Sequence, residues 1–230
     1  MADNVAVLAL SGGLDSTTLL HYAYKEMGYS KVHALGFFYG QKHPKELTCA
    51  EYQCGVTESR YTEGSEPWLE LSAALAGSTL SATGGAVPTL NQVLGDPQPS
   101  TYVPFRNLVI LSICLSVAEA VGAREVLCGI QRHDEYGYWD TTQAFIERLQ
   151  VVVNLQRKHP IRILAPFVNW SKADEIRWGT ANGVNYAQTW SCYNGRELAC
   201  GECPTCRERL KAFQLCGLKD PIAYEGDWNK

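Results

Sequence analysis

The chain has 230 residues, of which 46% are hydrophobic and 19% are charged, and its formal net charge is −4. This length suits one sizeable domain, alone or with a small appendage. An acidic balance argues against a general polyanion binder, so we expect no direct nucleic-acid partner. No apolar run is long enough to span a membrane, and the first ten residues carry no basic signal-peptide region. We therefore expect a cytoplasmic protein with no membrane partner.

Strand-like and helix-like segments alternate along the chain. In chain order the sequence predicts a strand at 5–10, a helix at 16–27, a strand at 32–39, a helix at 45–54, a long loop at 77–101, a helix at 107–121, a strand at 125–130, a helix at 142–159, a strand at 161–164 and a helix that Ser171 and Asp174 open and Gly183 closes. The alternation predicts an α/β fold, a doubly wound and mostly parallel sheet with helices on both faces. We divide the chain into a domain at 1–189 and a small appendage at 190–230.

The segment "LSGGLDSTT", residues 10–18, joins the first predicted strand to the first predicted helix. Ligands of open parallel sheets bind at such junctions, and glycines there let backbone N–H groups approach an anion. The segment has hydroxyl side chains for a phosphate but lacks the Gly-Lys-Ser/Thr of a P-loop kinase. Asp15 either caps the helix or binds a Mg²⁺ shared with phosphates. From the glycines alone, a plain strand–turn–helix corner is an equal alternative.

Nine cysteines are present, and four of them fall in one short segment with the spacing C-x7-C-x2-C-x2-C. These four are Cys192, Cys200, Cys203 and Cys206. Four thiolates with no open position predict a structural Zn²⁺ site, with an iron–sulfur cluster as the alternative. For the five scattered cysteines we expect small buried hydrophobic side chains.

The string "SGGLDS", residues 11–16, resembles the pyrophosphate loop S-G-G-x-D-S of the ATP pyrophosphatases. Those proteins cleave ATP between the α- and β-phosphates and adenylate an acceptor. The resemblance implies that this loop holds pyrophosphate as a leaving group, which fits the missing lysine. The implied nucleotide-binding residues are Leu10, Ser11, Gly12, Gly13, Leu14, Asp15, Ser16, Thr17 and Thr18.

Further segments narrow the resemblance. The strings "FYGQKHPKEL", "TYVPFRN", "CGIQRHDEYGYWD", "WSKADE" and "TWSCYNG…CGECPTC" follow the loop in the order seen in 7-cyano-7-deazaguanine synthases. That resemblance implies an adenine nucleotide alpha hydrolase-like fold and a ligase that forms C–N bonds. It implies conversion of 7-carboxy-7-deazaguanine and ammonia to the nitrile through an adenylate and an amide, with ATP going to AMP and pyrophosphate. It also implies Mg²⁺ with ATP, structural Zn²⁺ on the four cysteines, a homodimer and a role in queuosine-type biosynthesis.

The resemblance also assigns site residues. The implied catalytic residues are Ser11, Asp15, Ser16 and Lys172. The implied substrate-binding residues are Tyr39, Gln41, His43, Arg106, Asn107, Asp134, Tyr138 and Asp140. Lys172 would neutralise phosphate charge, with a solvated helix-start lysine as the alternative. Arg106 would lie near the active site, with a surface ion pair as the alternative. His43 is either an acid–base group or a plain hydrogen-bonding histidine.

Two segments depart from the family pattern. The stretch "YGYWDTTQ" keeps Tyr138 and Asp140 but has Trp139, Thr141 and Thr142 where the family has Pro, Cys and Arg, and Phe105 stands where a glycine is usual. Asp140 is still suited to the N–H groups of a guanine-like base. The lost arginine leaves a second endpoint open, in which the same chemistry stops at 7-amido-7-deazaguanine. A tRNA-modifying relative is a weaker alternative, because it needs a sulfur-relay cysteine pair and a basic surface. An ATP-binding scaffold without turnover is weaker still.

Overall fold

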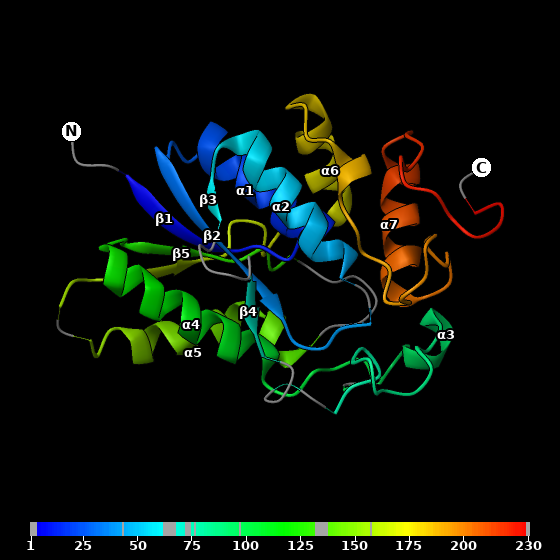
Figure 1. The fold of residues 1–230 in the computed structure, drawn as a ribbon, viewed down its shortest axis with the longest axis horizontal. Coiled ribbons are helices and arrows are strands. Elements are labelled where there is room, and N and C mark those ends of the chain that lie inside the picture. The colour runs from blue at the N-terminus through cyan, green and yellow to red at the C-terminus, as the bar shows by residue number, and fades with distance from the viewer. Residues whose placement is uncertain are drawn as a thin grey trace.

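A parallel sheet lies at the centre of the fold (Figure 1). The computed structural model describes residues 4–42, 44–61, 68–71, 75, 77–96, 98–131, 138–156 and 158–228. Five strands follow the order β3-β2-β1-β5-β6, and β4 pairs with β2. Their bounds are β1 Val5–Ala9, β2 Lys31–Phe38, β3 Arg60–Tyr61, β4 Trp68–Glu70, β5 Glu125–Leu127 and β6 Arg162–Leu164. All pairings between these strands are parallel, so their carboxyl ends lie at one edge of the sheet.

Helices cover both faces of this sheet. Their bounds are α1 Leu14–Lys25, α2 Lys45–Thr57, α3 Leu90–Val93, α4 Arg106–Val121, α5 Gln143–Val153, α6 Lys172–Ala181 and α7 Pro204–Leu215. In Figure 1, α1 and α2 lie over one face of the sheet, and α4 and α5 lie over the other. The predicted doubly wound fold is therefore confirmed. No helix among the described residues is long and apolar enough to cross a membrane.

Alternation along the strands builds a separate hydrophobic cluster on each face. Ala6 and Leu8 of β1 pack in a cluster with Leu20 of α1, whereas Val7 packs with Leu111 of α4. Successive side chains of a strand point to opposite faces, so one apolar run serves both clusters. The site begins at the carboxyl ends of β1, β2 and β5, which lie at one edge of the sheet.

Most predicted elements are present, but some predicted bounds were wrong. The helix predicted at 142–159 ends at Val153. Beyond its end, the side-chain oxygen of Gln156 accepts from the N–H groups of Lys158 and His159. The strand predicted at 125–130 ends at Leu127. Beyond it, Gly129 lies against the start of α1, where a Cβ atom would lie 3.1 Å from the Ser16 nitrogen. The helix predicted at 16–27 begins two residues earlier, at Leu14.

Two strands and two α-helices of the described structure were not predicted at all. Strands β3 and β4 are two and three residues long, too short for a period-2 pattern to show. Helix α3 interrupts the predicted loop at 77–101, and Thr89 and Gln92 form its capping box. Helix α7 follows Cys203 and has Pro204 at its first position. Proline at a first helical position indicates a helix start, but the segment was interpreted only as a cysteine cluster.

The C-terminal segment packs onto the sheet domain through α7. Ala212 and Phe213 of α7 share a hydrophobic cluster with Leu14 of α1 and Ile176 of α6. Arg209 is 1% exposed and pairs with Asp220 at 2.7 Å. Arg209 also donates to Thr189 Oγ1 and to the Tyr186 carbonyl oxygen, so the buried guanidinium is paired and hydrogen-bonded.

Candidate active site

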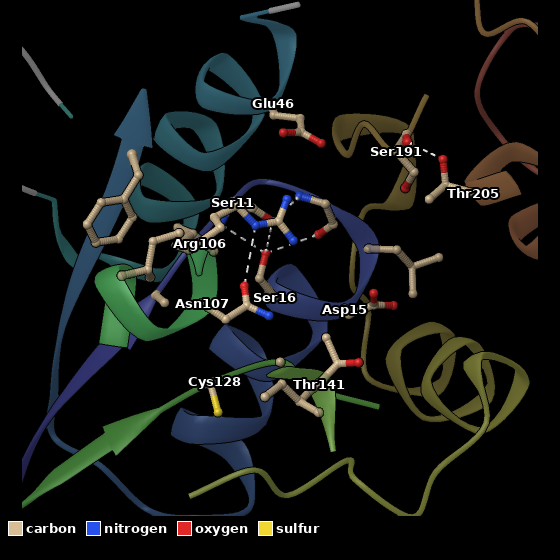
Figure 2. A pocket seen from close by; sticks show the side chains of 18 of the residues that line it. Ser11, Asp15, Ser16, Glu46, Arg106, Asn107, Cys128, Thr141, Ser191 and Thr205 are labelled. Atoms are coloured by element: carbon tan, nitrogen blue, oxygen red, sulfur yellow. Dashed lines mark hydrogen bonds between the residues drawn. The ribbon is translucent and has the colours of Figure 1, made fainter. Parts of the chain in front are cut away.

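A cavity of about 260 Å³ opens at the carboxyl ends of β1, β2 and β5. It is lined by the loop after β1, the segment after β2, the first turns of α2, α4 and α6, and residues after β5. The C-terminal segment closes its remaining side. Figure 2 shows the side chains of Ser11, Ser16, Arg106 and Asn107 converging in this cavity. Doubly wound sheets bind ligands at this edge, so the cavity is the candidate active site.

The loop after β1 is held by its own hydroxyl groups. Ser11 Oγ and Ser16 Oγ lie 2.9 Å apart, and the Gly13 N–H donates to Ser11 Oγ at 3.2 Å. Gly13 is the N-cap of α1, so the first-turn N–H groups have no intrahelical partner and point toward the loop. The loop therefore presents hydroxyls and backbone donors together, as anion binding requires.

Not all of the predicted nucleotide-binding residues line the cavity. Six do, namely Leu10, Ser11, Gly13, Leu14, Asp15 and Ser16. Gly12, Thr17 and Thr18 are not among the lining residues. The Thr18 hydroxyl donates to the Leu14 carbonyl oxygen at 2.8 Å and lies 2.9 Å from the Tyr186 hydroxyl. Thr18 thus stabilises the buried side of α1 and does not face the cavity.

Gly12 is required by close packing. Its φ is +81°, and a Cβ atom there would lie 1.9 Å from the Glu46 carbonyl oxygen of α2. The Gly12 carbonyl oxygen also accepts from the Trp190 N–H at 3.1 Å. The loop is therefore clamped between α2 and the C-terminal segment.

We expect Gly12→Ala to abolish ATP binding and to destabilise the fold by more than about 2 kcal/mol. A left-handed conformation costs a non-glycine residue ~1–2 kcal/mol, and the contact with Glu46 adds to it. Gly28→Ala is the matched control, because Gly28 has φ +70° with nothing within 4 Å of the added Cβ. Urea unfolding and ATP titration of both variants test this. Equal losses in the two variants would contradict the packing role of Gly12.

Asp15 and Lys172 form an ion pair at the edge of the cavity. Lys172 Nζ lies 2.8 and 3.0 Å from the two Asp15 carboxylate oxygens and 3.8 Å from Glu208. Burial alone would lower the pKa of Lys172, but Asp15 and Glu208 outweigh it and the net pKa is raised. Lys172 is therefore a firmly charged cation beside the loop. Asp15 is the second residue of α1, and Gly13 is the N-cap, so the capping interpretation of Asp15 was wrong.

The Ser171–Asp174 pair positions Lys172. The Ser171 side chain accepts from the Asp174 N–H, and the Ser171 N–H donates to Asp174 Oδ2 at 3.0 Å. The predicted N-cap is thus confirmed as a capping box. The capping box begins α6 at Lys172. The side chain of Lys172 is only 13% exposed, so the alternative of a solvated lysine at a helix start is wrong.

Glu175 lies behind this ion pair and was missed by the sequence interpretation. It is 0% exposed, and neither carboxylate oxygen has a hydrogen-bond partner among the described residues. Burial, and then the charge of Asp15, raise the pKa of Glu175 well above its ordinary value. Burial at this position therefore favours the neutral form of the Glu175 carboxyl group.

Arg106 extends into the cavity from the first turn of α4. Its guanidinium donates to the Tyr39 hydroxyl at 3.3 Å and to Asn107 Oδ1 at 3.4 Å, and it lies 5.6 Å from the Tyr39 ring centroid. Within the described part of the chain, no carboxylate lies within 4.0 Å of it, so the surface ion pair is not found. A half-buried guanidinium with no carboxylate in ion-pair contact in this part of the chain is suited to a ligand carboxylate or phosphate.

Asp140 and Tyr138 have different surroundings. Asp140 is 2% exposed and does not line the cavity. Its carboxylate accepts from the Asn107 N–H at 3.4 Å, and its carbonyl accepts from Asn107 Nδ2 at 3.1 Å. Asp140 thus holds the start of α4, whereas Tyr138 lines the cavity and bonds Thr101 at 2.7 Å.

Gln41 braces the end of β2. Its side-chain oxygen accepts from the Tyr39 N–H at 2.8 Å, and its amide donates to the Phe37 carbonyl at 3.2 Å. Gln41 and Tyr39 both line the cavity. The predicted site residues His43 and Asp134 lie outside the described residues.

The four clustered cysteines meet at one point. Their sulfur atoms all lie within 4.8 Å of one another, and all four side chains are buried. Cys200 Sγ and Cys206 Sγ are 4.0 Å apart, and the Cys203 N–H approaches Cys200 Sγ at 3.3 Å. A tetrahedral ion with metal–sulfur bonds of about 2.3 Å requires sulfurs about 3.8 Å apart. This group is therefore suited to hold a metal ion.

The cysteine-bearing segment also forms one wall of the cavity. The wall residues are Trp190, Ser191, Tyr193, Thr205 and Glu208. Thr205 Oγ1 donates to the Ser191 carbonyl at 2.6 Å, so the two halves of the wall are tied beside Cys192 and Cys206. The C-terminal appendage therefore also shapes the site.

A family model described as "Queuosine biosynthesis protein QueC" matches residues 5–217 of this chain. The chain belongs to this family. A 7-cyano-7-deazaguanine synthase of Clostridium kluyveri is 41% identical over 232 residues, covering 96% of this chain and 98% of the relative. One of Methanoculleus marisnigri is 43% identical over 225 residues, covering 96% and 98%. Among solved structures, an NMN synthetase from Francisella tularensis matches with a TM-score of 0.49 and 12% identity, covering 95% of this chain and 79% of that chain.

Phe105 and Trp139, the two aromatic departures from the QueC-family pattern, contact each other. Their rings meet edge to face with centroids 5.4 Å apart. The Tyr102 hydroxyl accepts from both the Phe105 N–H and Trp139 Nε1, each at 2.9 Å. Phe105 has φ 53° and ψ 19°, a left-handed conformation that favours glycine. We infer that the contact with Trp139 compensates for the strain, so that α4 still begins at Arg106.

We expect Phe105→Gly to be more stable than Phe105→Ala by about 1 kcal/mol. Both variants lose the ring contact, but only alanine keeps the left-handed strain. Urea unfolding of the two variants measures the difference directly. An alanine variant as stable as the glycine variant would show that the backbone at 105 relaxes and carries no strain.

Three further cavity residues show no sequence pattern that would mark them as site residues. Glu46 lies in the first turn of α2, and Glu208 lies in the second turn of α7. Gln131 follows β5, and its side-chain oxygen has no hydrogen-bond partner among the described residues. A carboxylate in a helix's first turn is common because it complements the helix dipole. Such residues become site candidates only once the fold turns them toward a cavity.

Proposed function

We propose that this protein converts 7-carboxy-7-deazaguanine and ammonia to 7-cyano-7-deazaguanine, with ATP going to AMP and pyrophosphate. One observation carries the proposal: Ser11 and Ser16 of the loop after β1, Lys172 and Arg106 line the same cavity. ATP held at the loop and an acid held at Arg106 would therefore share one small volume. The relatives from Clostridium kluyveri and Methanoculleus marisnigri are 7-cyano-7-deazaguanine synthases, which supports the same reaction.

In the first half-reaction, an oxygen of the substrate carboxylate attacks the α-phosphorus and pyrophosphate leaves. Ser11, Ser16 and the α1 N-terminus would stabilise the leaving group, and Lys172 would neutralise its charge. Ammonia then attacks the acyl carbon, and AMP departs with the carboxylate oxygen to leave the amide. Adenylation provides the leaving group that a free carboxylate lacks.

In the second half-reaction, the amide oxygen attacks the α-phosphorus of a second ATP. Loss of AMP and a proton then forms the nitrile, so both carboxylate oxygens end in AMP. Mg²⁺ would arrive with ATP and supply charge neutralisation of its phosphates. Asp15 now bonds Lys172, and phosphate binding would free it, since Lys172 can pair with a phosphate and Asp15 with the cation.

We propose that Cys192, Cys200, Cys203 and Cys206 hold a structural Zn²⁺. The sulfur separations are those of a single tetrahedral ion, which supports zinc over a cluster whose iron atoms would hold the thiolates farther apart. The buried set leaves no open coordination position, which supports a structural rather than a catalytic role.

The position of Thr142 favours the nitrile over the amide as the endpoint. Thr142 stands where the family pattern has an arginine, but it is the N-cap of α5 and does not line the cavity. A missing arginine there leaves Arg106 as the cationic group for the substrate carboxylate. The altered stretch does reach the cavity at Thr141, so the amide stays the second candidate.

We also propose that the protein works as a homodimer on small molecules. Val151, Val152 and Leu155 at the end of α5 are 66%, 62% and 76% exposed, an apolar surface that a second copy would cover. Light scattering at assay concentration tests the dimer independently of the reaction.

Mass spectrometry of the product tests the function. Purified protein is incubated with Mg·ATP, ammonium and 7-carboxy-7-deazaguanine. A product with the nitrile mass supports the proposal, and a product heavier by one water identifies the amide. Absence of ATP turnover with this acid would overturn the proposed substrate.

A further inference from the structure

Glu46 is a carboxylate in the cavity to which the proposed reaction assigns no role. It is the second residue of α2 and lines the cavity, with its backbone carbonyl oxygen packed against Gly12. Within the described residues its side chain makes no hydrogen bond and no ion pair. The other lining carboxylates, Asp15 and Glu208, both face Lys172. Among the described residues, Glu46 has no cation within ion-pair distance, and Arg106 is the positive charge that acts on it.

The surroundings of Glu46 differ from those of a helix-capping carboxylate in water. Burial raises the pKa of Glu46 to about 8, and the positive charge of Arg106 opposes the rise. Figure 2 shows its carboxylate above the region where Ser11 and Arg106 meet, turned toward the cavity rather than along α2. The raised pKa favours the neutral acid form of Glu46. A ligand that supplies two N–H donors would favour the carboxylate form and lower this pKa again.

We propose that Glu46 recognises the guanine-type edge of the substrate, accepting its ring N–H and exocyclic amino hydrogens. This inference rests on the proposed function and names the residue that selects the base. Two adjacent N–H donors match the two oxygens of one carboxylate. Adenine places a ring acceptor beside its amino group, so the same carboxylate would repel it. Glu46 therefore acts on the acid substrate and not on ATP.

Arg106 and Glu46 both line the cavity, and their opposite charges would suit opposite chemical ends of the substrate. Arg106 offers donors to the carboxylate, and Glu46 offers acceptors to the base edge. Tyr39, whose ring already lies against Arg106, gives a planar base a surface on which to stack. Asp140, the acidic residue for which the sequence suggested this role, does not line the cavity.

The test compares wild type with Glu46→Gln on two substrates: 7-carboxy-7-deazaguanine and the same acid lacking the exocyclic amino group. We expect E46Q to raise KM for the first acid by roughly 10- to 100-fold, the range for hydrogen bonds to a charged group, with KM for ATP unchanged. Wild type should disfavour the amino-lacking acid by about 10-fold or more, and E46Q should lose most of this discrimination.

Glu51→Gln is the matched control, because Glu51 lies on the exposed face of the same helix. It should leave both KM values unchanged, and melting curves should show all three proteins folded. A raised KM for ATP in E46Q, a lowered kcat with both KM values unchanged, or unaltered discrimination between the two acids would each overturn the inference while leaving the function intact. No turnover of the first acid by wild type would overturn the proposed function, and this inference with it.

Discussion

Removing the proposed zinc from the four-cysteine site is expected to lower activity by more than about 100-fold and to destabilise the fold by several kcal/mol. Binding of structural zinc stabilises small domains by ~10–16 kcal/mol, and part of that energy is folding energy here. The same segment supplies Trp190, Thr205 and Glu208 to the cavity, and the Trp190 N–H bonds the Gly12 carbonyl. Loss of the metal should therefore disorder one wall of the site and loosen the loop.

Two treatments test this prediction: incubation with a chelator and the substitution Cys206→Ser. Metal content by elemental mass spectrometry, melting temperature and ATP turnover are measured for each. Cys216→Ser is the matched control, because Cys216 lies outside the group and its thiol donates to the Ala173 carbonyl, as a serine hydroxyl also can. Full activity in metal-free protein would contradict the role of the segment in shaping the cavity.

Replacing Lys172 with alanine is expected to lower kcat/KM by about 10²–10³-fold, the effect of losing one preorganised group that stabilises developing charge. The substitution also leaves Asp15 and Glu208 without their cation. Breaking a fully buried pair costs ~3–5 kcal/mol, and Asp15 is 29% exposed, so we expect a smaller loss of about 1–3 kcal/mol.

Arg177→Ala on the same helix separates the two effects. Arg177 pairs with Asp174 at 2.8 Å, but its side chain is 55% exposed, so the substitution should cost under about 0.5 kcal/mol and leave turnover unchanged. Lys172→Arg should restore stability better than turnover, because the charge returns in a different geometry. Wild-type turnover in Lys172→Ala would remove this lysine from the account of catalysis.

The parts of the fold that the sequence predicted are those with a local cause. Ser171 and Asp174 are close in the chain, so their capping box was visible before the structure. The apolar run that became β1 and the loop that follows it were visible for the same reason. The four cysteines came together because their spacing is short.

The rest depended on contacts between distant segments. No local pattern shows that Glu46 faces a cavity, that Glu175 lies behind Asp15, or that Glu208 of α7 approaches Lys172. Asp140 is a residue whose role the sequence suggested and the fold does not support. Its carboxylate suits a base-binding role, but in the fold it bonds the start of α4. The left-handed conformation of Phe105 was equally hidden, although the expected glycine at that position was a clue.

Oxygen transfer from the substrate carboxylate to AMP tests the central claim most directly. The acid is prepared with ¹⁸O in both carboxylate oxygens and incubated with the protein, Mg·ATP and ammonium, and AMP and the deazaguanine product are weighed by mass spectrometry. The two-stage account predicts two AMP per nitrile, each carrying one ¹⁸O. Unlabelled AMP, or ADP and phosphate in place of AMP and pyrophosphate, would contradict adenylation of the substrate at this site.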